Sequence, residues 1–171
     1  MICIRKASED DLKIIHDMAQ VVFRHTYREI LSPEQMEYMM DMMYSMPNLQ
    51  LQIQEGHHYY IAYSDEVPCG YVSVQHEGPD GDGVEVFHLH KIYVMPQTQG
   101  KGAGMQLFET VVDHVRSIVY GQPARIELNV NKYNKAVSFY RHLGMRVLLE
   151  EDFPIGNGFY KTDFIMGFDL D

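Results

Sequence analysis

Apolar residues recur at two spacings along the chain, and the changes between them predict the order of elements. Spacing of three and four residues places side chains on one face of a helix, and it occurs in residues 8–25, 32–45, 102–119 and 134–143. Alternation with a period of two indicates strands, and strand patterns occupy residues 2–5, 58–64, 70–76, 84–94, 125–130, 145–150 and 159–168. The predicted order is therefore β-α-α-β-β-β-α-β-α-β-β.

Capping signals support these boundaries. Ser8 is followed three residues later by Asp11, and Ser32-Pro33 by Gln35, so each serine predicts a helix start with a reciprocal cap. Pro47 is expected to end the second helix because proline lacks the amide that a helix interior needs. Gly144 supplies a left-handed stop for the last helix.

This order predicts one α/β (α+β) domain over residues 1–171. Its β-α-β steps require parallel neighbours, and its hairpins require antiparallel ones. We therefore expect a mixed sheet of about six or seven strands, with about four helices distributed over both faces. A length of 171 residues suits a single hydrophobic core.

Charge and cysteine content narrow the class of partner. A formal net charge of -10 repels phosphate backbones and anionic lipids, so neither nucleic acid nor membrane is an expected partner. Cys3 and Cys69 are far apart and have no metal-ligand spacing, so we expect no disulfide and no metal. The first residues are too short an apolar run for a signal peptide, which predicts a cytoplasmic protein.

The most informative segment leads from a strand through the glycine-rich turn Gln99–Gly104 into a strong helix. Glycines allow close approach of a ligand, and the free amides of a helix start attract anions, so the turn predicts a diphosphate site. A dinucleotide-binding motif would need glycine where Met105 or Leu107 stands. The P-loop pattern also fails, since no Gly-Lys-Ser/Thr follows at the required spacing.

The run Gln99-x-x-Gly102-x-Gly104 resembles the Q/R-x-x-G-x-G/A signature of the GNAT N-acetyltransferases. Downstream, residues 134–145 resemble the Asn…Ala…Tyr…Gly helix of the same family, and the element order matches over the whole chain. The resemblance implies the GNAT fold and an acyltransferase that moves acetyl from acetyl-CoA to a primary amine by direct attack.

The same resemblance assigns a coenzyme A site. One strand would pair its backbone with the pantetheine arm, through Ile92, Tyr93 and Val94. The pyrophosphate would lie against amides of the glycine turn, from Gln99, Gly100, Lys101, Gly102, Ala103 and Gly104. Either Asn131 or Asn134 would bind the cofactor, although a helix cap is an equal reading of Asn134.

Candidate catalytic groups follow from the same alignment of motifs. Tyr140 matches the tyrosine that protonates the leaving thiolate, with core packing as the alternative reading. His90 occupies the place where many relatives carry a glutamate base, and His88 lies two residues earlier on the same strand face. Each imidazole titrates near neutrality, and each is equally compatible with a structural role.

The acceptor is sought in the first two helices and the final hairpin. Residues 23–27, 32–36 and 159–166 are similar to bacterial spermidine/spermine-type acetyltransferases, which implies a polyamine or other small cationic amine. The candidate acceptor residues are Phe23, Tyr27, Glu29, Glu34 and Asp163. A peptide-amine acetyltransferase and a non-catalytic CoA-binding regulator are the alternatives, and a homodimer is left open.

Overall fold

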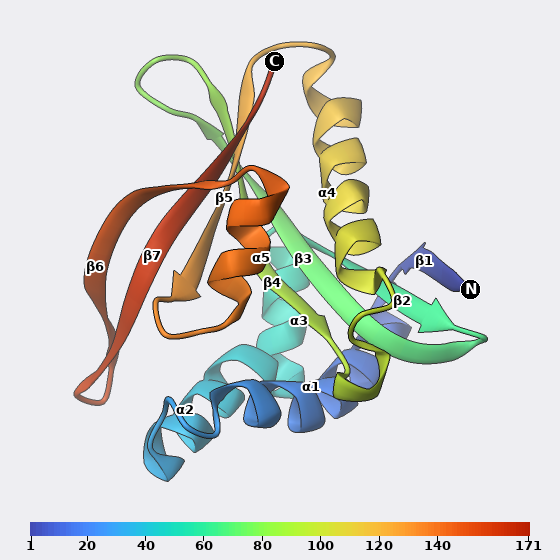
Figure 1. The fold of residues 1–171 in the computed structure, drawn as a ribbon, viewed down its shortest axis with the longest axis vertical. Coiled ribbons are helices and arrows are strands. Elements are labelled where there is room, and N and C mark those ends of the chain that lie inside the picture. The colour runs from blue at the N-terminus through green and yellow to red at the C-terminus, as the bar shows by residue number, and fades with distance from the viewer.

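The computed structural model describes residues 1–171 as a mixed α/β domain (Figure 1). Its strands are β1 (Ile2–Lys6), β2 (His57–Ser64), β3 (Val67–Pro79), β4 (Glu85–Val94), β5 (Ala124–Asn131), β6 (Arg146–Gly156) and β7 (Phe159–Leu170). Its helices are α1 (Leu12–Tyr27), α2 (Pro33–Tyr44), α3 (Met46–Gln54), α4 (Ala103–Val119) and α5 (Ala136–Leu143). No helix is both long and apolar enough to span a bilayer.

All seven strands form one sheet in the order β1-β2-β3-β4-β5-β7-β6. Only β4 and β5 are parallel neighbours, and every other adjacent pair is antiparallel. The predicted mixed sheet is thereby confirmed, with β4-α4-β5 as its parallel crossover. The hairpins extend beyond the sequence-based boundaries, since β3 begins at Val67 and β6 continues to Gly156.

Two irregularities in β4 position the site. Pairing with β5 covers only Glu85–His88 against Ala124–Glu127, after which the two strands part. On the other side, Ser73 pairs with Lys91 and Val74 with Leu89, so that His90 has no partner and forms a β-bulge. From Leu89 onward, the β5-facing edge of β4 therefore has no neighbouring strand.

The helices divide into two layers that bury separate cores. One core packs α4 and α5 against residues such as Val72, Phe87 and Ile126. The other packs α1, α2 and α3 against the opposite face, through Tyr59, Ile61 and Tyr71 among others. The apolar face of α4 is thus buried, as its sequence pattern predicts.

The structure has one α-helix more than the four helical ranges of the sequence, because Pro47 lies in the first turn of a new helix. Ser45 closes α2 and at the same time caps α3, its hydroxyl accepting from the Asn48 amide at 3.3 Å. Pro47 then occupies the first turn of α3, where its missing amide costs no hydrogen bond. The structure therefore has five helices, and α2 and α3 meet in an elbow at Ser45.

The start of α2 agrees with the sequence except at Gln35. Ser32 accepts from the Gln35 amide at 3.1 Å, and Pro33 is the first helical residue, as predicted. The Gln35 side chain does not return to the cap. Its Nε2 instead donates to the Tyr160 carbonyl at 2.8 Å, which joins α2 to the β6–β7 hairpin.

Candidate active site

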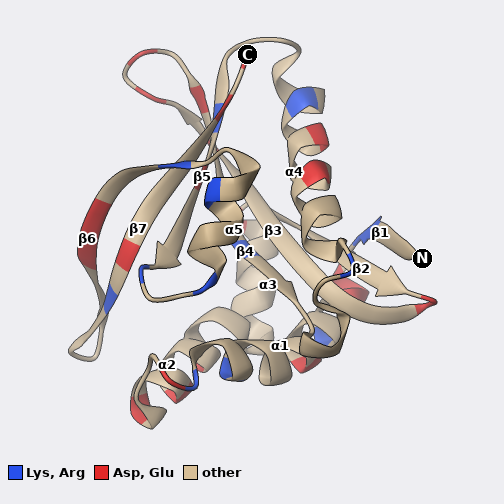
Figure 2. Ribbon diagram, viewed as in Figure 1, with Lys and Arg blue, Asp and Glu red and all other residues tan.

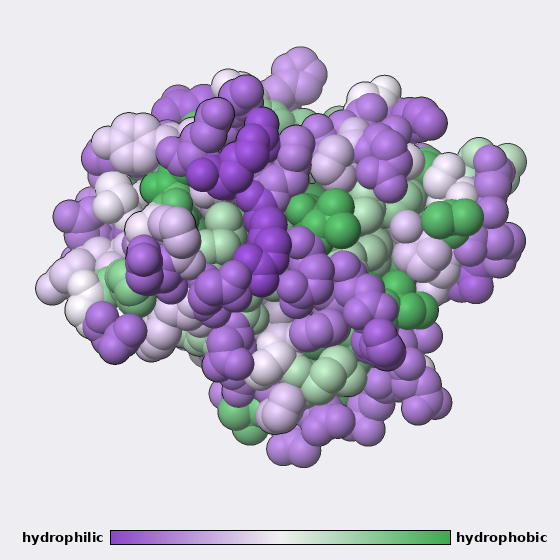
Figure 3. All heavy atoms as spheres, turned by 90° about the horizontal axis from the view of Figure 1, so that it is seen from below, coloured by the Kyte–Doolittle hydropathy of each residue, from purple (hydrophilic) through white to green (hydrophobic).

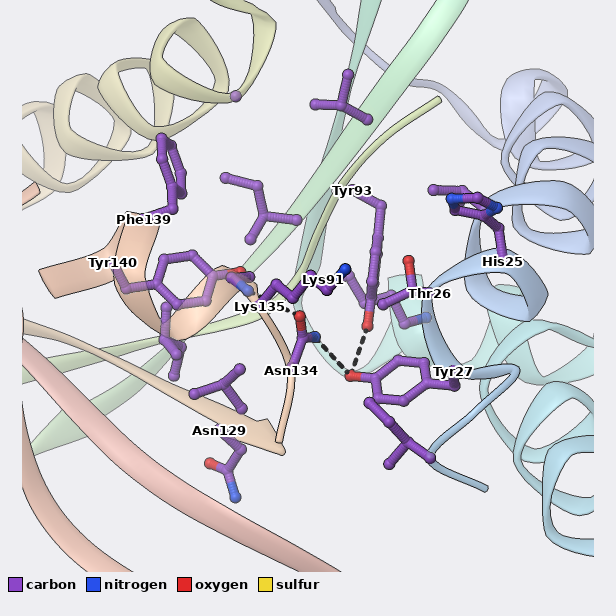
Figure 4. Close-up of a pocket in the computed structure, with 18 of the residues that line it drawn as sticks. His25, Thr26, Tyr27, Lys91, Tyr93, Asn129, Asn134, Lys135, Phe139 and Tyr140 are labelled. Atoms are coloured by element: carbon purple, nitrogen blue, oxygen red, sulfur yellow. Dashed lines mark hydrogen bonds between the residues drawn. The ribbon is translucent and has the colours of Figure 1, made fainter. Parts of the chain in front are cut away.

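A cavity of about 540 Å³ opens where β4 and β5 part. Its walls come from the C-terminal end of α1, the segment Leu89–Val94 of β4, the end of β5 and the helix α5 (Figure 4). A pocket at the carboxyl end of diverging parallel strands is a common place for ligands in α/β folds. The fold thus brings residues from three distant parts of the chain to one cavity.

The glycine turn lies at one end of this cavity, and its backbone amides from Gly100 onward are free. Gly100 and Gly102 both have φ of +85°, a conformation that side chains other than glycine rarely adopt. The backbone amides from Gly100 to Met105 donate to no acceptor within the protein. The start of α4 therefore presents a row of free N–H groups with the positive end of its dipole behind them.

The predicted cofactor residues divide into two sets. Those that line the cavity are Ile92, Tyr93, Val94, Gln99, Gly104 and Asn134. Those of the turn itself lie outside the enclosed volume, with Gly100, Lys101 and Gly102 exposed and Ala103 buried under α4. A ligand that filled the cavity and reached the turn would touch both sets.

The two candidate asparagines have different surroundings. Asn131 is the last residue of β5; its Oδ1 accepts from the Tyr133 amide at 2.9 Å, and it does not line the cavity. Asn134 accepts from the Ala136 amide at 2.9 Å and so caps α5. Its Nδ2 also points into the cavity, where it donates to the Tyr27 hydroxyl at 3.3 Å (Figure 4).

Tyr140 presents a free hydroxyl to the cavity. The residue is 6% exposed, lines the cavity from α5, and its hydroxyl makes no hydrogen bond with the protein. Burial raises the pKa of Tyr140, and the nearby Tyr27 adds to the effect. The phenol is therefore protonated at neutral pH and available as a proton donor.

His90 lines the cavity from the bulge of β4, and its tautomer follows from its neighbours. The Gln75 amide donates to the Glu55 carbonyl at 2.8 Å, which turns its Oε1 toward His90 Nε2 at 2.9 Å. Because that oxygen can only accept, His90 carries its proton on Nε2. Nδ1 is the nitrogen left to accept a proton.

His90 is also part of a row of three imidazoles. The ring of His57 stacks on the ring of His90, with 4.3 Å between the centroids. The ring of His88, two residues earlier on β4, lies 4.4 Å from it. Burial lowers the pKa of His90 to about 2, with further contributions from His88 and His57. His90 is thus neutral at physiological pH, whereas His88 lies off the cavity with Nδ1 3.6 Å from Glu77 Oε1.

The candidate acceptor residues are not all brought together. Tyr27 and Glu29 line the cavity, and Asp163 lies beside it, 1% exposed, with the cavity residue Asn129 at 3.4 Å from its Oδ2. Phe23 is buried behind Tyr27 in the aromatic core, at 4.6 Å between ring centroids. Glu34 is exposed in the first turn of α2 and does not line the cavity.

Sequence reasoning missed Lys91, which is 4% exposed although it stands between His90 and Ile92 in the best-recognised segment. Its position predicts a side chain on the face opposite His90. The bulge cancels that alternation, so both side chains lie on the side of α1, α2 and α3. Nothing in the sequence marks the bulge, and only a lysine inside an apolar strand gave a signal.

Comparison with known proteins agrees with this geometry. The model of the acetyltransferase (GNAT) domain matches residues 25–161. The chain belongs to the GNAT family. An uncharacterised N-acetyltransferase in the pepI 3′ region of Lactobacillus delbrueckii subsp. lactis is 27% identical over 170 residues, covering 95% of this chain and 94% of that protein.

Solved structures show the same GNAT fold. The PaiA N-acetyltransferase of Thermoplasma acidophilum, in complex with coenzyme A, superimposes with a TM-score of 0.75 at 24% identity, covering 98% of each chain. Arabidopsis thaliana Naa50, in complex with the bisubstrate analogue CoA-Ac-MVNAL, gives 0.66 at 15% identity and covers 99% of each chain. As a GNAT protein, the chain is an acyltransferase, and its sheet and helices follow the family's arrangement.

Proposed function

We propose that this GNAT protein is a single-domain, acetyl-CoA-dependent N-acetyltransferase that acts on a small cationic amine. The observation that carries the proposal is the row of free amides from Gly100 to Met105 at the mouth of a cavity beside an unpaired strand edge. A diphosphate and an extended, amide-containing arm are the two chemical features that such a surface matches. Coenzyme A has both.

The chain offers a place for each part of the cofactor. The amides of the glycine turn would hold the pyrophosphate, and Lys101 adds a positive charge there. The free edge of β4 at Ile92, Tyr93 and Val94 would pair with the pantetheine arm. The cavity volume of about 540 Å³ lies within the range of small-ligand sites.

Three protein groups would act on the reacting atoms. The amide near Val94 would stabilise the negative charge that develops on the thioester oxygen as the amine nitrogen bonds to the carbonyl carbon. Tyr140 would give its proton to the sulfur as the carbon–sulfur bond breaks. The amine would lose its extra proton to His90 Nδ1, directly or through water.

The low pKa of His90 limits how that proton is removed. An imidazole whose pKa is about 2 is always neutral near pH 7, but it is a weak base. A neighbouring ammonium group lowers this pKa further, so His90 would accept the proton only as the amine nitrogen bonds to the thioester carbon and becomes strongly acidic. A water relay from His90 through the cavity is the alternative route within the same proposal.

Electrostatics and enclosure support a small cationic acceptor. The carboxylate of Asp163 is buried beside the cavity, with Lys161 Nζ 3.3 Å from its Oδ2, and Glu29 lines the cavity. Figure 2 shows a further acidic stretch on β6, which comprises Glu150, Glu151 and Asp152. A polyamine, with several ammonium groups on an apolar chain, is the acceptor class that this distribution favours.

The contact between α2 and the β6–β7 hairpin favours a small molecule over a peptide. Gln35 and Tyr38 of α2 bond to the carbonyls of Tyr160 and Ile155, and the ring of Tyr38 lies 5.4 Å from that of Phe159. These contacts close the gap between α2 and the hairpin, so an extended peptide chain could not pass between them. The face seen from below is mostly hydrophilic, with separate apolar spots and no broad apolar surface (Figure 3).

An acetylation screen tests the proposal. Purified protein with acetyl-CoA would be offered spermidine, an aminoglycoside, single amino acids and a pentapeptide with a free amino terminus, and release of the free thiol would be followed. We expect turnover with spermidine and little with the pentapeptide. Preferred acetylation of the pentapeptide would replace the acceptor class, and acetyl-CoA binding without turnover on any amine would make the protein a regulator.

A further inference from the structure

The buried amine of Lys91 has three acceptors from three different elements. Its Nζ donates to the Met43 carbonyl at 2.9 Å, to Gln52 Oε1 at 2.8 Å and to the Tyr59 hydroxyl at 2.5 Å. These acceptors belong to α2, α3 and β2. An ammonium group has three N–H donors, so the charged form of the side chain satisfies all three acceptors.

No carboxylate accompanies this charge. Lys91 forms no ion pair, and the face of Tyr44 lies 4.4 Å from its Nζ. The Met43 carbonyl is one of the last of α2, so the amine also lies at the negative end of that helix. Burial nevertheless lowers the pKa of Lys91 to about 7. A buried charge without a counter-ion is costly, and a methionine would fill the same space without that cost.

Four side-chain donors from three elements hold the α2–α3 elbow. His16 Nδ1 lies 2.7 Å from the Tyr44 carbonyl, Asn48 donates to Asp41 and Gln52 to Met43, both at 3.0 Å. His16 comes from α1, and the two amides come from α3. Lys91 is the one donor that comes from the strand lining the cavity.

The other end of α2 reaches the acceptor side. Gln35 and Tyr38 bond to the β6–β7 hairpin, and the loop before α2 contributes Arg28, Glu29 and Ile30 to the cavity wall. A rotation of α2 about its elbow would therefore move both the hairpin and this wall. The position of α2 depends on what holds its C-terminal end.

We propose that Lys91 is a positioning residue that ties α2 to the cavity strand β4. It thereby fixes the cavity wall before α2, formed by Arg28, Glu29 and Ile30, where the acceptor amine would bind. This inference rests on the proposed function, because it assumes that an acceptor amine binds beside the cavity wall that Lys91 positions. The cofactor half does not depend on the tie, since β4 is held by β3 on both sides of the bulge and the glycine turn belongs to α4.

Kinetics of matched variants test the assignment, with spermidine and acetyl-CoA as the substrates. We expect Lys91→Met to raise the KM for spermidine about tenfold, the usual scale for losing a charge-assisted hydrogen bond, while the KM for acetyl-CoA stays within about twofold. Tyr59→Phe removes one acceptor and should act in the same direction, but less. Tyr60→Phe is the control, because it loses one hydroxyl contact, 2.9 Å from His114, on the opposite face of the same strand.

Hydrogen exchange gives a second measurement that needs no acceptor. In Lys91→Met, amides between Met43 and Asn48 should exchange faster than in the wild type, while those of α4 stay unchanged. Equal spermidine KM in wild type and Lys91→Met, or unchanged exchange at the elbow, would overturn the inference. A wild-type protein that does not acetylate spermidine would defeat the proposed acceptor class alone, and exchange would still decide the role of Lys91.

Discussion

The side-chain amide of Asn134 donates to the hydroxyl of Tyr27 across the cavity, at 3.3 Å, and thereby joins the entrance of α5 to the end of α1. Tyr27 is in turn 3.4 Å from the Tyr93 hydroxyl on β4. One small network thus links three of the cavity's walls. It also gives Asn134 two separate jobs, since its Oδ1 caps α5.

Asn134→Asp separates these jobs. The carboxylate keeps an acceptor for the Ala136 amide but has no N–H to donate into the cavity. If the amide binds the cofactor, we expect calorimetry to show acetyl-CoA affinity reduced about tenfold. Tyr27→Phe removes the same hydrogen bond from the other side and should leave that affinity within about twofold. Equal losses in the two variants would assign Asn134 to holding Tyr27.

Gly102→Glu should abolish acetyl-CoA binding, because it places a carboxylate among the amides that would receive phosphate. Gly121→Glu is a matched control at the other end of α4. Both glycines have nearly the same left-handed backbone, with φ of +85° and +84°, and an added Cβ would meet nothing within 4 Å at either. Calorimetry that shows the two variants binding equally well would remove the turn from the cofactor site.

Tyr140→Phe should lower kcat about 100-fold and leave the KM for acetyl-CoA nearly unchanged, since it removes a proton donor without changing the shape of the cavity. Circular dichroism and thermal melting should match the wild type, because the hydroxyl bonds to no protein group. A kcat within about twofold of the wild type would assign Tyr140 to packing.

Stability should fall as the pH drops below about 6.5. Burial lowers the pKa of His90 to about 2, and those of His57 and His114 to about 4. Between these values and the unfolded value near 6.5, the unfolded chain binds more protons than the folded one, so acid favours unfolding. Above pH 6.5 this contribution is fully present.

Urea denaturation at several pH values measures this dependence. We expect the midpoint to decrease from pH 6.5 to 4.5, and the decrease to be smaller in His90→Gln, which cannot titrate. An equal slope in that variant would show that His90 does not carry the low pKa.

Most of the helices and strands could be predicted from capping residues and apolar spacing in the sequence. The start of α2 at Ser32-Pro33 and the apolar face of α4 depend on residues that lie within a few positions of one another. The elbow at Ser45 is harder, because one serine closes α2 and caps α3 and Pro47 suits either role. Distinguishing an end from a restart required the tertiary contacts of Leu49, which is fully buried.

The site divides in the same way. The positive φ of Gly100 and Gly102 agrees with the tight glycine turn that the sequence predicts, and their part in cofactor binding stays a prediction. The direction of the Lys91 side chain could not be predicted, because it depends on a bulge that arises from pairing between β3 and β4. Likewise, no local pattern reveals that Gln35 reaches Tyr160, 125 residues away in the chain.

The parting of β4 and β5 divides the sheet into two parts, β1–β4 and β5–β7, which pair through only four residues on each side. Across the opening, contacts such as that between Asn134 and Tyr27 are single hydrogen bonds. A molecule bound in the opening would contact both parts of the sheet and hold them together. Occupancy should therefore stiffen the whole domain, so that acetyl-CoA raises its melting temperature through regions that the ligand never touches.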